Sequence, residues 1–453
     1  MKKHVDLLKG PVLSSLTRLA IPIMATSLIQ MAYNLTDMIW IGRIGSDAVA
    51  AVGAAGMYMW LSNGLASLAK MGGQVNVGYA LGSERKKEAS LYTANALQLS
   101  VILGLIYGLI CSGFNSPLIG FFKLNSPHVI SDARMYLVIT CGFVIFSFLN
   151  QTFTGIFTAI GNSRAAFLAT TAGLLVNIIL DPILIFGIGP FPELGVQGAA
   201  LATVIARYIE ALIVVIWAHI HRGKNRYLEG AYTGFGIPLA ELKAILIKGF
   251  PLMMNEVLWA AGMTTVTQCY SVRGLDVVAG LNIASTITNL FNIVYLQLGS
   301  CISIVVGQYL GAGKLEDAKD ADNKMIVFSV FCCVIMAALM FVVGGFFPGI
   351  YNTTEEIREL ATSFIAVSAI IMPFCAFSHA SYFTLRSGGK TVVTFLFDSV
   401  FTWVIVVPAA YLLAHFTGLG IVSIYFLVQG TELIKVIIGY LMVKSNVWVV
   451  QMV

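Results

Sequence analysis

The sequence predicts an all-α polytopic membrane protein with twelve transmembrane helices in two six-helix lobes. Its 453 residues are 58% hydrophobic and only 11% charged, whereas soluble domains are typically about 25% charged. The apolar residues form long segments, many of them exceeding the roughly 20 residues that a helix needs to cross a bilayer. The two halves of the chain also share a sequence pattern at a nearly constant offset.

Twelve apolar segments follow one another along the chain. They cover about residues 16–43, 52–82, 93–122, 133–160, 164–187, 195–221, 241–272, 277–311, 320–349, 357–386, 390–415 and 417–444. Lys and Arg are concentrated in every second loop, which predicts a multi-pass protein of the cell membrane with both termini in the cytoplasm. The N-terminal MKKHVDLLKG lacks the apolar core of a signal peptide, so none is expected.

An internal repeat defines the predicted domains. At an offset of 229 residues the halves match without a gap over residues 22–89, and the register then slips by a few residues. Matching positions include Pro22 with Pro251, Thr36 with Thr265, Asn63 with Asn292, and Gly78–Gly82 with Gly307–Gly311. Each half has six spans, so the predicted lobes are related by a pseudo-two-fold axis along the membrane normal, as in transporters. We predict an N-lobe at 1–221, a cytoplasmic linker at 222–240 and a C-lobe at 241–453.

A polar stripe interrupts the first apolar segment. Gln30, Asn34 and Asp37 are spaced i, i+4, i+7 and therefore share one helical face. A charge facing lipid at the bilayer centre costs at least ~2.5–3.5 kcal/mol, so this face is expected to point into protein or water. The stripe is either an ion or proton site, or a buried polar contact that only joins helices.

A second carboxylate, Asp181, lies in the fifth segment, with Asn177 one turn before it on the same face. The repeat aligns Asp37 with Val266 and Asp181 with Pro408. Both carboxylates are therefore specific to the first half, which favours a functional role. Thr203 in the sixth segment reaches a similar depth. Two carboxylates close together in the membrane must share a proton or bind a cation.

The motifs that carry these residues resemble the multidrug and toxic compound extrusion (MATE) family of secondary transporters. All four motifs lie in the first half: NLTDMIWIG and GSDAVAAVG near its beginning, and NIILDPILIFG and GVQGAALAT near its end. The resemblance covers the whole chain. It implies a cation-coupled antiporter that exports amphipathic, mostly cationic drugs or toxic compounds by alternating access. It also implies an ion-coupling site at Asp37, Asp181, Asn177 and Thr203, to which we add Asn34, with H⁺ or Na⁺ as the coupling ion.

Other ionisable residues within the spans allow two interpretations. Glu256 and Asp398 lie at similar depths in the C-lobe, and they either form structural ion pairs or attract a cationic substrate. We predict substrate contacts at Glu256, Asp398, Gln30 and Met31, because flexible methionines suit a pocket that accepts varied ligands. Lys70 is specific to the first half and is expected in an ion pair, and His379 is expected to be a core histidine.

Competing functional classes find less support. A membrane enzyme would need clustered catalytic or metal-binding residues at one depth, and none is apparent. A channel gives no reason for carboxylates in one half alone. A lipid-linked glycan or lipid flippase of the same superfamily is the alternative, although an anionic pyrophosphate needs buried Arg or Lys. We expect no cofactor, no certain metal site and no nucleic-acid partner. The expected partners are small amphipathic cations and membrane lipids, and the protein is expected to be a monomer.

Overall fold

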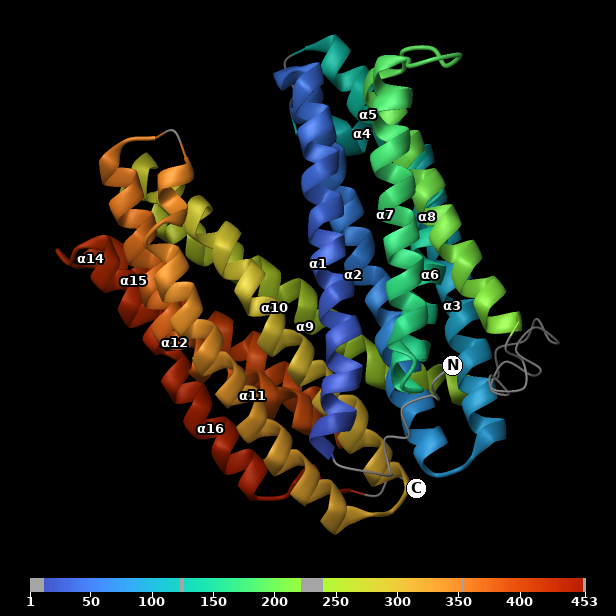
Figure 1. The fold of residues 1–453 in the computed structure, drawn as a ribbon, viewed down its shortest axis with the longest axis vertical. Helices are drawn as coiled ribbons and strands as arrows, with labels where there is room; N and C mark the ends of the chain where they lie inside the picture. Colours follow the sequence, from blue (N-terminus) through green and yellow to red (C-terminus); the bar gives the residue numbers. More distant parts are fainter. Residues whose placement is uncertain (1–11, 123–125, 221–238, 352, 451–453) are drawn as a thin grey trace. The chain divides into compact units, whose positions relative to one another are not determined.

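The computed structural model describes residues 12–122, 126–220, 239–351 and 353–450, and the regular structure in these ranges is helical (Figure 1). The chain divides into two compact units. The first contains Ile21–Met253, and the second contains Met254–Val453 together with α1 up to Ala20. The predicted linker at 222–240 lies almost entirely outside the described residues.

The helices confirm the predicted fold class. Ten described helices are long and apolar enough to cross a membrane, and the bent pair α5 (Pro127–Gly142) and α6 (Ile145–Ala159) makes an eleventh span with a 44° bend. The glycine-rich α2 (Ser46–Gly82) supplies the remaining long helix. The ten apolar helices, the bent pair and α2 coincide with the twelve predicted segments. Several of them begin a few residues early, because polar residues form their first turns.

The first unit contains most of α1, helices α2 to α8 and the beginning of α9. The bounds of the remaining elements are α1 (Val12–Ile44), α3 (Lys86–Gly113), α4 (Asn115–Gly120), α7 (Ser163–Phe186), α8 (Gly195–Ile220) and α9 (Leu239–Ser271). Buried small and aromatic side chains fill the core, with Phe148, Phe153 and Phe157 fully enclosed on α6. Phe153 and Phe157 belong to a buried cluster that also contains Val77, and a separate cluster lies around Ile41.

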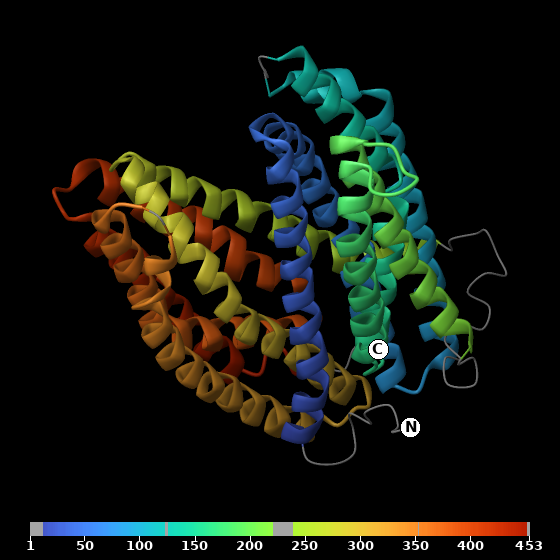
Figure 2. The same ribbon diagram turned by 45° about the horizontal axis from the view of Figure 1, so that its top comes forward.

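Helices α7 and α8 lie side by side along their length, as Figures 1 and 2 show in green. Glycine permits this close approach. A Cβ atom built on Gly198 of α8 would overlap the Leu184 carbonyl of α7, and one built on Gly173 of α7 would overlap the Glu210 carboxylate of α8. Small residues at such crossings are typical of membrane helices. The close packing of this pair positions the polar residues described below.

The second unit contains the rest of α9 and the helices that follow. They are α10 (Leu275–Gly311), α11 (Leu315–Gly344), η2 (Phe347–Ile350), α12 (Glu355–Ser387), α13 (Thr391–Phe395), η3 (Leu396–Val400), η4 (Thr402–Val406), α14 (Val407–Phe416), α15 (Ile421–Gly430) and α16 (Glu432–Lys444). Helix α12 is central, since it packs against α10, α11, α15 and α16. Most of the core of this unit gathers around it, including Phe364, Ile365 and Met372.

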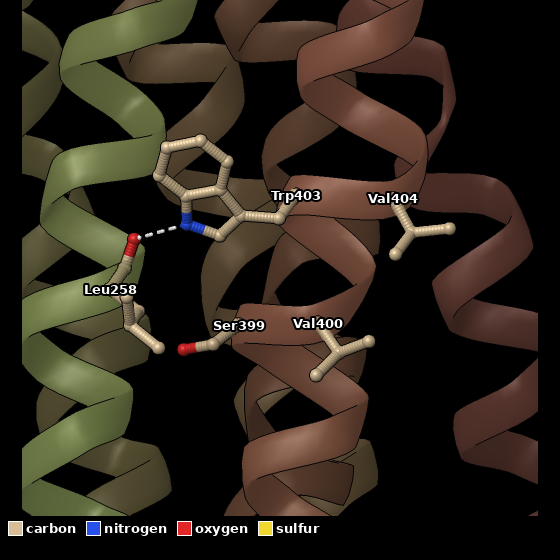
Figure 3. A pocket seen from close by; sticks show the side chains of 5 residues that line it. All are labelled: Leu258, Ser399, Val400, Trp403 and Val404. Carbon is tan, nitrogen blue, oxygen red and sulfur yellow. Dashed lines mark hydrogen bonds between the residues drawn. The ribbon is translucent and has the colours of Figure 1, made fainter.

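The candidate span Thr391–Phe416 is not a regular α-helix. Its segments η3 and η4 are π-helical, and Pro408 lies two residues after the end of η4. Proline lacks the N–H that would close the preceding turn, and its ring crowds the carbonyl four residues earlier, which favours a wider turn there. Figure 3 shows Ser399 and Trp403 facing α9, where Trp403 Nε1 donates a 2.9 Å hydrogen bond to the Leu258 carbonyl oxygen. Val400 and Val404 point away from α9. A cavity of about 350 Å³ is lined by Leu258, Ser399, Val400, Trp403 and Val404.

Candidate functional site

Three helices of the first unit bring polar side chains into one buried cluster. Helix α1 contributes Tyr33 and Asp37, α7 contributes Asn177 and Asp181, and α8 contributes Thr203. Asn177 and Asp181 are completely buried, Tyr33 is 3% exposed and Thr203 is 7% exposed. Spacings of four residues on α1 and α7 place each pair on one helical face. The sequence had predicted four of these five residues to lie together.

The cluster is rich in oxygen atoms that lack hydrogen-bond partners. Asn177 Nδ2 donates to Asp181 Oδ1 over 3.0 Å. The Tyr33 and Thr203 hydroxyl groups are neighbours. Five buried oxygens make no hydrogen bond of good geometry with any described residue: Tyr33 Oη, Asp37 Oδ1, Asn177 Oδ1, Asp181 Oδ2 and Thr203 Oγ1. Because buried polar atoms are nearly always satisfied in folded proteins, this concentration makes the cluster the candidate ligand-binding site of the first unit.

The electrostatics favour a cation. Asp37 and Asp181 are close enough to interact electrostatically, and Tyr136 of α5 lies within reach of both. Two neighbouring carboxylates in a low-dielectric interior cannot both remain charged without compensation. They can share a proton, or they can hold a hard cation whose coordination shell the amide and hydroxyl oxygens would complete. Among the described residues, no group of three or more His, Cys, Asp or Glu could hold a metal ion.

An ion pair on α8, in which Glu210 is completely buried and Arg207 is partly buried, adjoins this cluster, and the sequence analysis missed it. Arg207 Nη1 donates to both Glu210 carboxylate oxygens, at 3.1 and 2.9 Å. Asn150 of α6 also donates to Glu210, over 2.6 Å. The Arg207 guanidinium lies 4.5 Å from the centre of the Tyr33 ring. The signal was available, since two opposite charges three residues apart inside an apolar segment indicate a buried pair.

The structure does not place the other predicted binding residues of α1 in this cluster. Gln30 shares the face of Asp37 but is exposed, and Met31 is half-buried. The side chain of Asn34 lies outside the described ones. These assignments therefore remain predictions.

The second unit has a polar cluster of its own, in which an acidic residue is already paired with a lysine. Asp398 accepts a hydrogen bond at 2.5 Å from Lys435 of α16 and one at 3.0 Å from Asn255 of α9. Asn255 is fixed in turn by Ser399, whose hydroxyl donates to Asn255 Oδ1 over 2.7 Å. Lys435 is only 5% exposed. The Asp398 charge is therefore compensated within the protein.

A cavity of about 90 Å³ adjoins this pair, and Glu256 lines it as an exposed residue. The other lining residues are Asn255, Trp259, Leu296, Ser378, His379, Tyr382, Phe383, Asp398 and Lys435. His379 Nδ1 lies 3.0 Å from the Cys375 carbonyl oxygen, and its ring packs 4.8 Å from that of Tyr295. Lys70, in the first unit, is half-buried.

Comparison with known proteins identifies the family. The sequence profile described as MatE matches residues 22–183 and 251–412, once in each half of the chain. A probable multidrug resistance protein NorM of Thermotoga maritima is 24% identical over 409 residues, which cover 90% of this chain and 87% of that protein. An FAD transporter of Shewanella oneidensis is 25% identical, with 81% of this chain and 80% of that protein covered.

Solved structures agree on the fold. A MATE crystal structure in the bent conformation superposes with a TM-score of 0.90 at 23% identity, covering 98% of each chain. A transporter of the MOP superfamily from Pyrococcus furiosus gives a TM-score of 0.89, also at 23% identity and 98% coverage of both chains. With the profile matching both halves, the chain belongs to the MATE family of membrane transporters, and it is not an enzyme.

Proposed function

We propose that this transporter is an antiporter that exports small amphipathic cations in exchange for H⁺ or Na⁺. The observation that carries the proposal is the set of five unpaired, buried oxygens contributed by α1, α7 and α8. A carrier needs a site of this kind at its centre, because the coupling ion must be dehydrated and then released.

Asp37 and Asp181 are the ion-coupling residues in this proposal, with Asn177, Thr203 and Asn34 as supporting ligands. Asn177 supports the proposal through its hydrogen bond to Asp181, which fixes one carboxylate oxygen. Proton binding would neutralise one carboxylate of the pair. Na⁺ would instead be held by carboxylate, amide and hydroxyl oxygens together, with no protein cofactor required.

The substrate-binding proposal rests on Glu256, with Gln30, Met31 and Asp398 as further predicted contacts. Of the two acidic residues that line the small cavity, Asp398 is compensated by Lys435. In this proposal Glu256, which lines the cavity as an exposed residue, attracts the cation. The cavity of about 90 Å³ is far smaller than the roughly 300–1,000 Å³ of drug-sized sites. It therefore suits the charged head of a ligand whose apolar body lies elsewhere.

The alternative function, a flippase for lipid-linked glycans, needs cationic groups for the pyrophosphate. The buried Lys435 and the partly buried Arg207 are each bonded to a carboxylate, so neither charge is left for a pyrophosphate. The concentration of Lys and Arg in alternate loops supports insertion in the cell membrane with both termini cytoplasmic. We further propose that the protein works as a monomer.

The test is efflux of a fluorescent cation from proteoliposomes, with an imposed H⁺ gradient and an imposed Na⁺ gradient applied separately. Antiport predicts transport driven by one of the two gradients and lost in Asp37→Asn. A protein that moves the dye equally well without any gradient would contradict the proposal. Retention of cationic dyes combined with transport of a pyrophosphate lipid would favour the flippase.

A further inference from the structure

Arg207 lies between two acidic groups with different roles. Its Nη1 is bonded to Glu210 at 2.9 and 3.1 Å, while its guanidinium packs on the ring of Tyr33. It also interacts electrostatically with Asp37. A permanent positive charge therefore lies beside the proposed cation site, yet it is bonded to a carboxylate outside that site.

The carboxylate of Glu210 is held in place by three helices. It is completely buried, Asn150 of α6 donates to it, and Gly173 of α7 leaves the space that it occupies. A buried carboxylate is strongly destabilising unless it is paired and hydrogen-bonded. Both conditions are met here, so this arrangement keeps the Arg207 charge compensated.

We propose that the Arg207 charge competes with the coupling cation, H⁺ or Na⁺, at the Asp37–Asp181 site. Glu210 sets the cation affinity of that site by compensating the Arg207 charge. The inference rests on the proposed function, because it concerns the same site. In a low-dielectric interior, one uncompensated positive charge close to a cation site weakens cation binding considerably. When the cation leaves, the nearby guanidinium limits the charge left uncompensated on Asp37.

The internal repeat supplies a comparison. In the register that matches Leu194 with Leu419, Arg207 corresponds to Glu432 and Glu210 corresponds to Lys435. The second half therefore carries charges at the same two helical positions with opposite sign. There Lys435 bonds directly to Asp398, so that the protein itself supplies the cation. In the first half the reversed order holds the basic group on Glu210 and leaves Asp37 and Asp181 to an external cation.

The test measures equilibrium cation binding to the purified full-length protein rather than transport. Radioactive Na⁺ reports Na⁺ binding, and proton uptake after a pH jump reports H⁺ binding. Binding that is lost in Asp37→Asn belongs to the site. If neither cation binds in an Asp37-dependent way, the proposed function itself fails, and this inference fails with it.

The variants are Arg207→Gln, Glu210→Gln and the double substitution. We expect Arg207→Gln to tighten cation binding about tenfold and Glu210→Gln to weaken it by a similar factor, within the roughly 5–150-fold range of typical coupling. The double variant should return to within about threefold of the wild type. Arg207→Lys should retain the positive charge and reverse most of the tightening. Arg43→Gln removes an exposed cation from α1 and should change little, because solvent screens that charge.

Opposite shifts in the two single variants are the decisive result, since a purely structural pair would weaken binding in both. Parallel losses, or no shift in either variant, would overturn the inference while leaving Asp37-dependent binding and the proposed function intact. If Arg207→Gln alone does not fold, the comparison of Glu210→Gln with the double variant still decides. Removal of the Arg207 charge should restore the cation binding that Glu210→Gln loses, whereas a double variant that binds as weakly as Glu210→Gln would overturn the inference.

Discussion

Asn177 donates a hydrogen bond to Asp181 across one turn of α7, at 3.0 Å from Nδ2 to Oδ1, and both residues are completely buried. The bond satisfies one carboxylate oxygen and leaves Asp181 Oδ2 without a partner among the described residues. The neutral amide therefore fixes the orientation of the carboxylate without adding a charge to the site. The unsatisfied oxygen is then available to a proton or a metal cation.

Asp37→Asn is predicted to abolish gradient-driven efflux. The substitution keeps the size of the side chain but removes one of two interacting carboxylates, so the coupling ion loses most of its attraction. Folding stability should be unchanged or slightly higher, because a desolvated charge has been removed. Efflux assays in proteoliposomes, with protein amount checked by chromatography, test this directly. Transport at the wild-type rate would show that Asp37 does not couple efflux to the ion gradient.

Asp181→Asn should disable coupling in the same way, and the double variant should be little worse than either single variant. Residues that act as one unit are strongly non-additive. Their electrostatic interaction in the structure is the reason to expect this. The measurement is the initial efflux rate under the driving gradient in all three variants. Two independent, multiplicative losses would indicate separate sites.

Much of this architecture could be predicted from the sequence. Long apolar segments and the repeat define the spans, because the bilayer imposes their length and the repeat gives each half six apolar segments. The contact between Asn177 and Asp181 could also be predicted, since contacts between residues four apart in one helix follow from their spacing.

Contacts between distant segments could not be read in this way. Asp398 and Lys435 are 37 residues apart in the sequence, and Asp398 lies in the π-helical segment η3, so no spacing rule pairs them. Gln30 shares a face with Asp37 on α1, yet the structure leaves it exposed. A shared helical face does not determine which neighbouring helix covers each part of it.

Lys435→Met is predicted to destabilise the protein by about 3–5 kcal/mol, the usual cost of leaving one partner of a buried ion pair uncompensated. Asp398 would then retain only neutral hydrogen bonds, including the one from Asn255. The double substitution Lys435→Met with Asp398→Asn should recover most of the loss, because no buried charge remains. Thermal unfolding in detergent, followed by tryptophan fluorescence, measures both variants. A single variant as stable as the wild type would contradict a compensated pair.

Gly173→Ala tests the position of Glu210 without changing any charge. The added methyl group would overlap the Glu210 carboxylate, and such overpacking typically costs about 1–3 kcal/mol. Displacement of the carboxylate should release Arg207 towards Asp37, so cation binding should weaken along with thermal stability. Gly56→Ala is the matched control, because nothing lies within 4 Å of a Cβ there and alanine favours helix. Equal behaviour of the two variants would argue against close contact at Gly173.

Glu256→Gln separates substrate capture from ion coupling. Glu256 lines the small cavity in the second unit as an exposed residue. If a monovalent cation is recognised there by its charge, the substitution should weaken binding by about 1–3 kcal/mol, the scale of a charge-assisted contact. A neutral ligand of the same shape should lose much less, and turnover at saturating substrate should survive. Equilibrium binding of the matched cationic and neutral ligands to purified protein measures the difference. Equal losses for both ligands would mean that Glu256 supports the fold of the cavity rather than the recognition of charge.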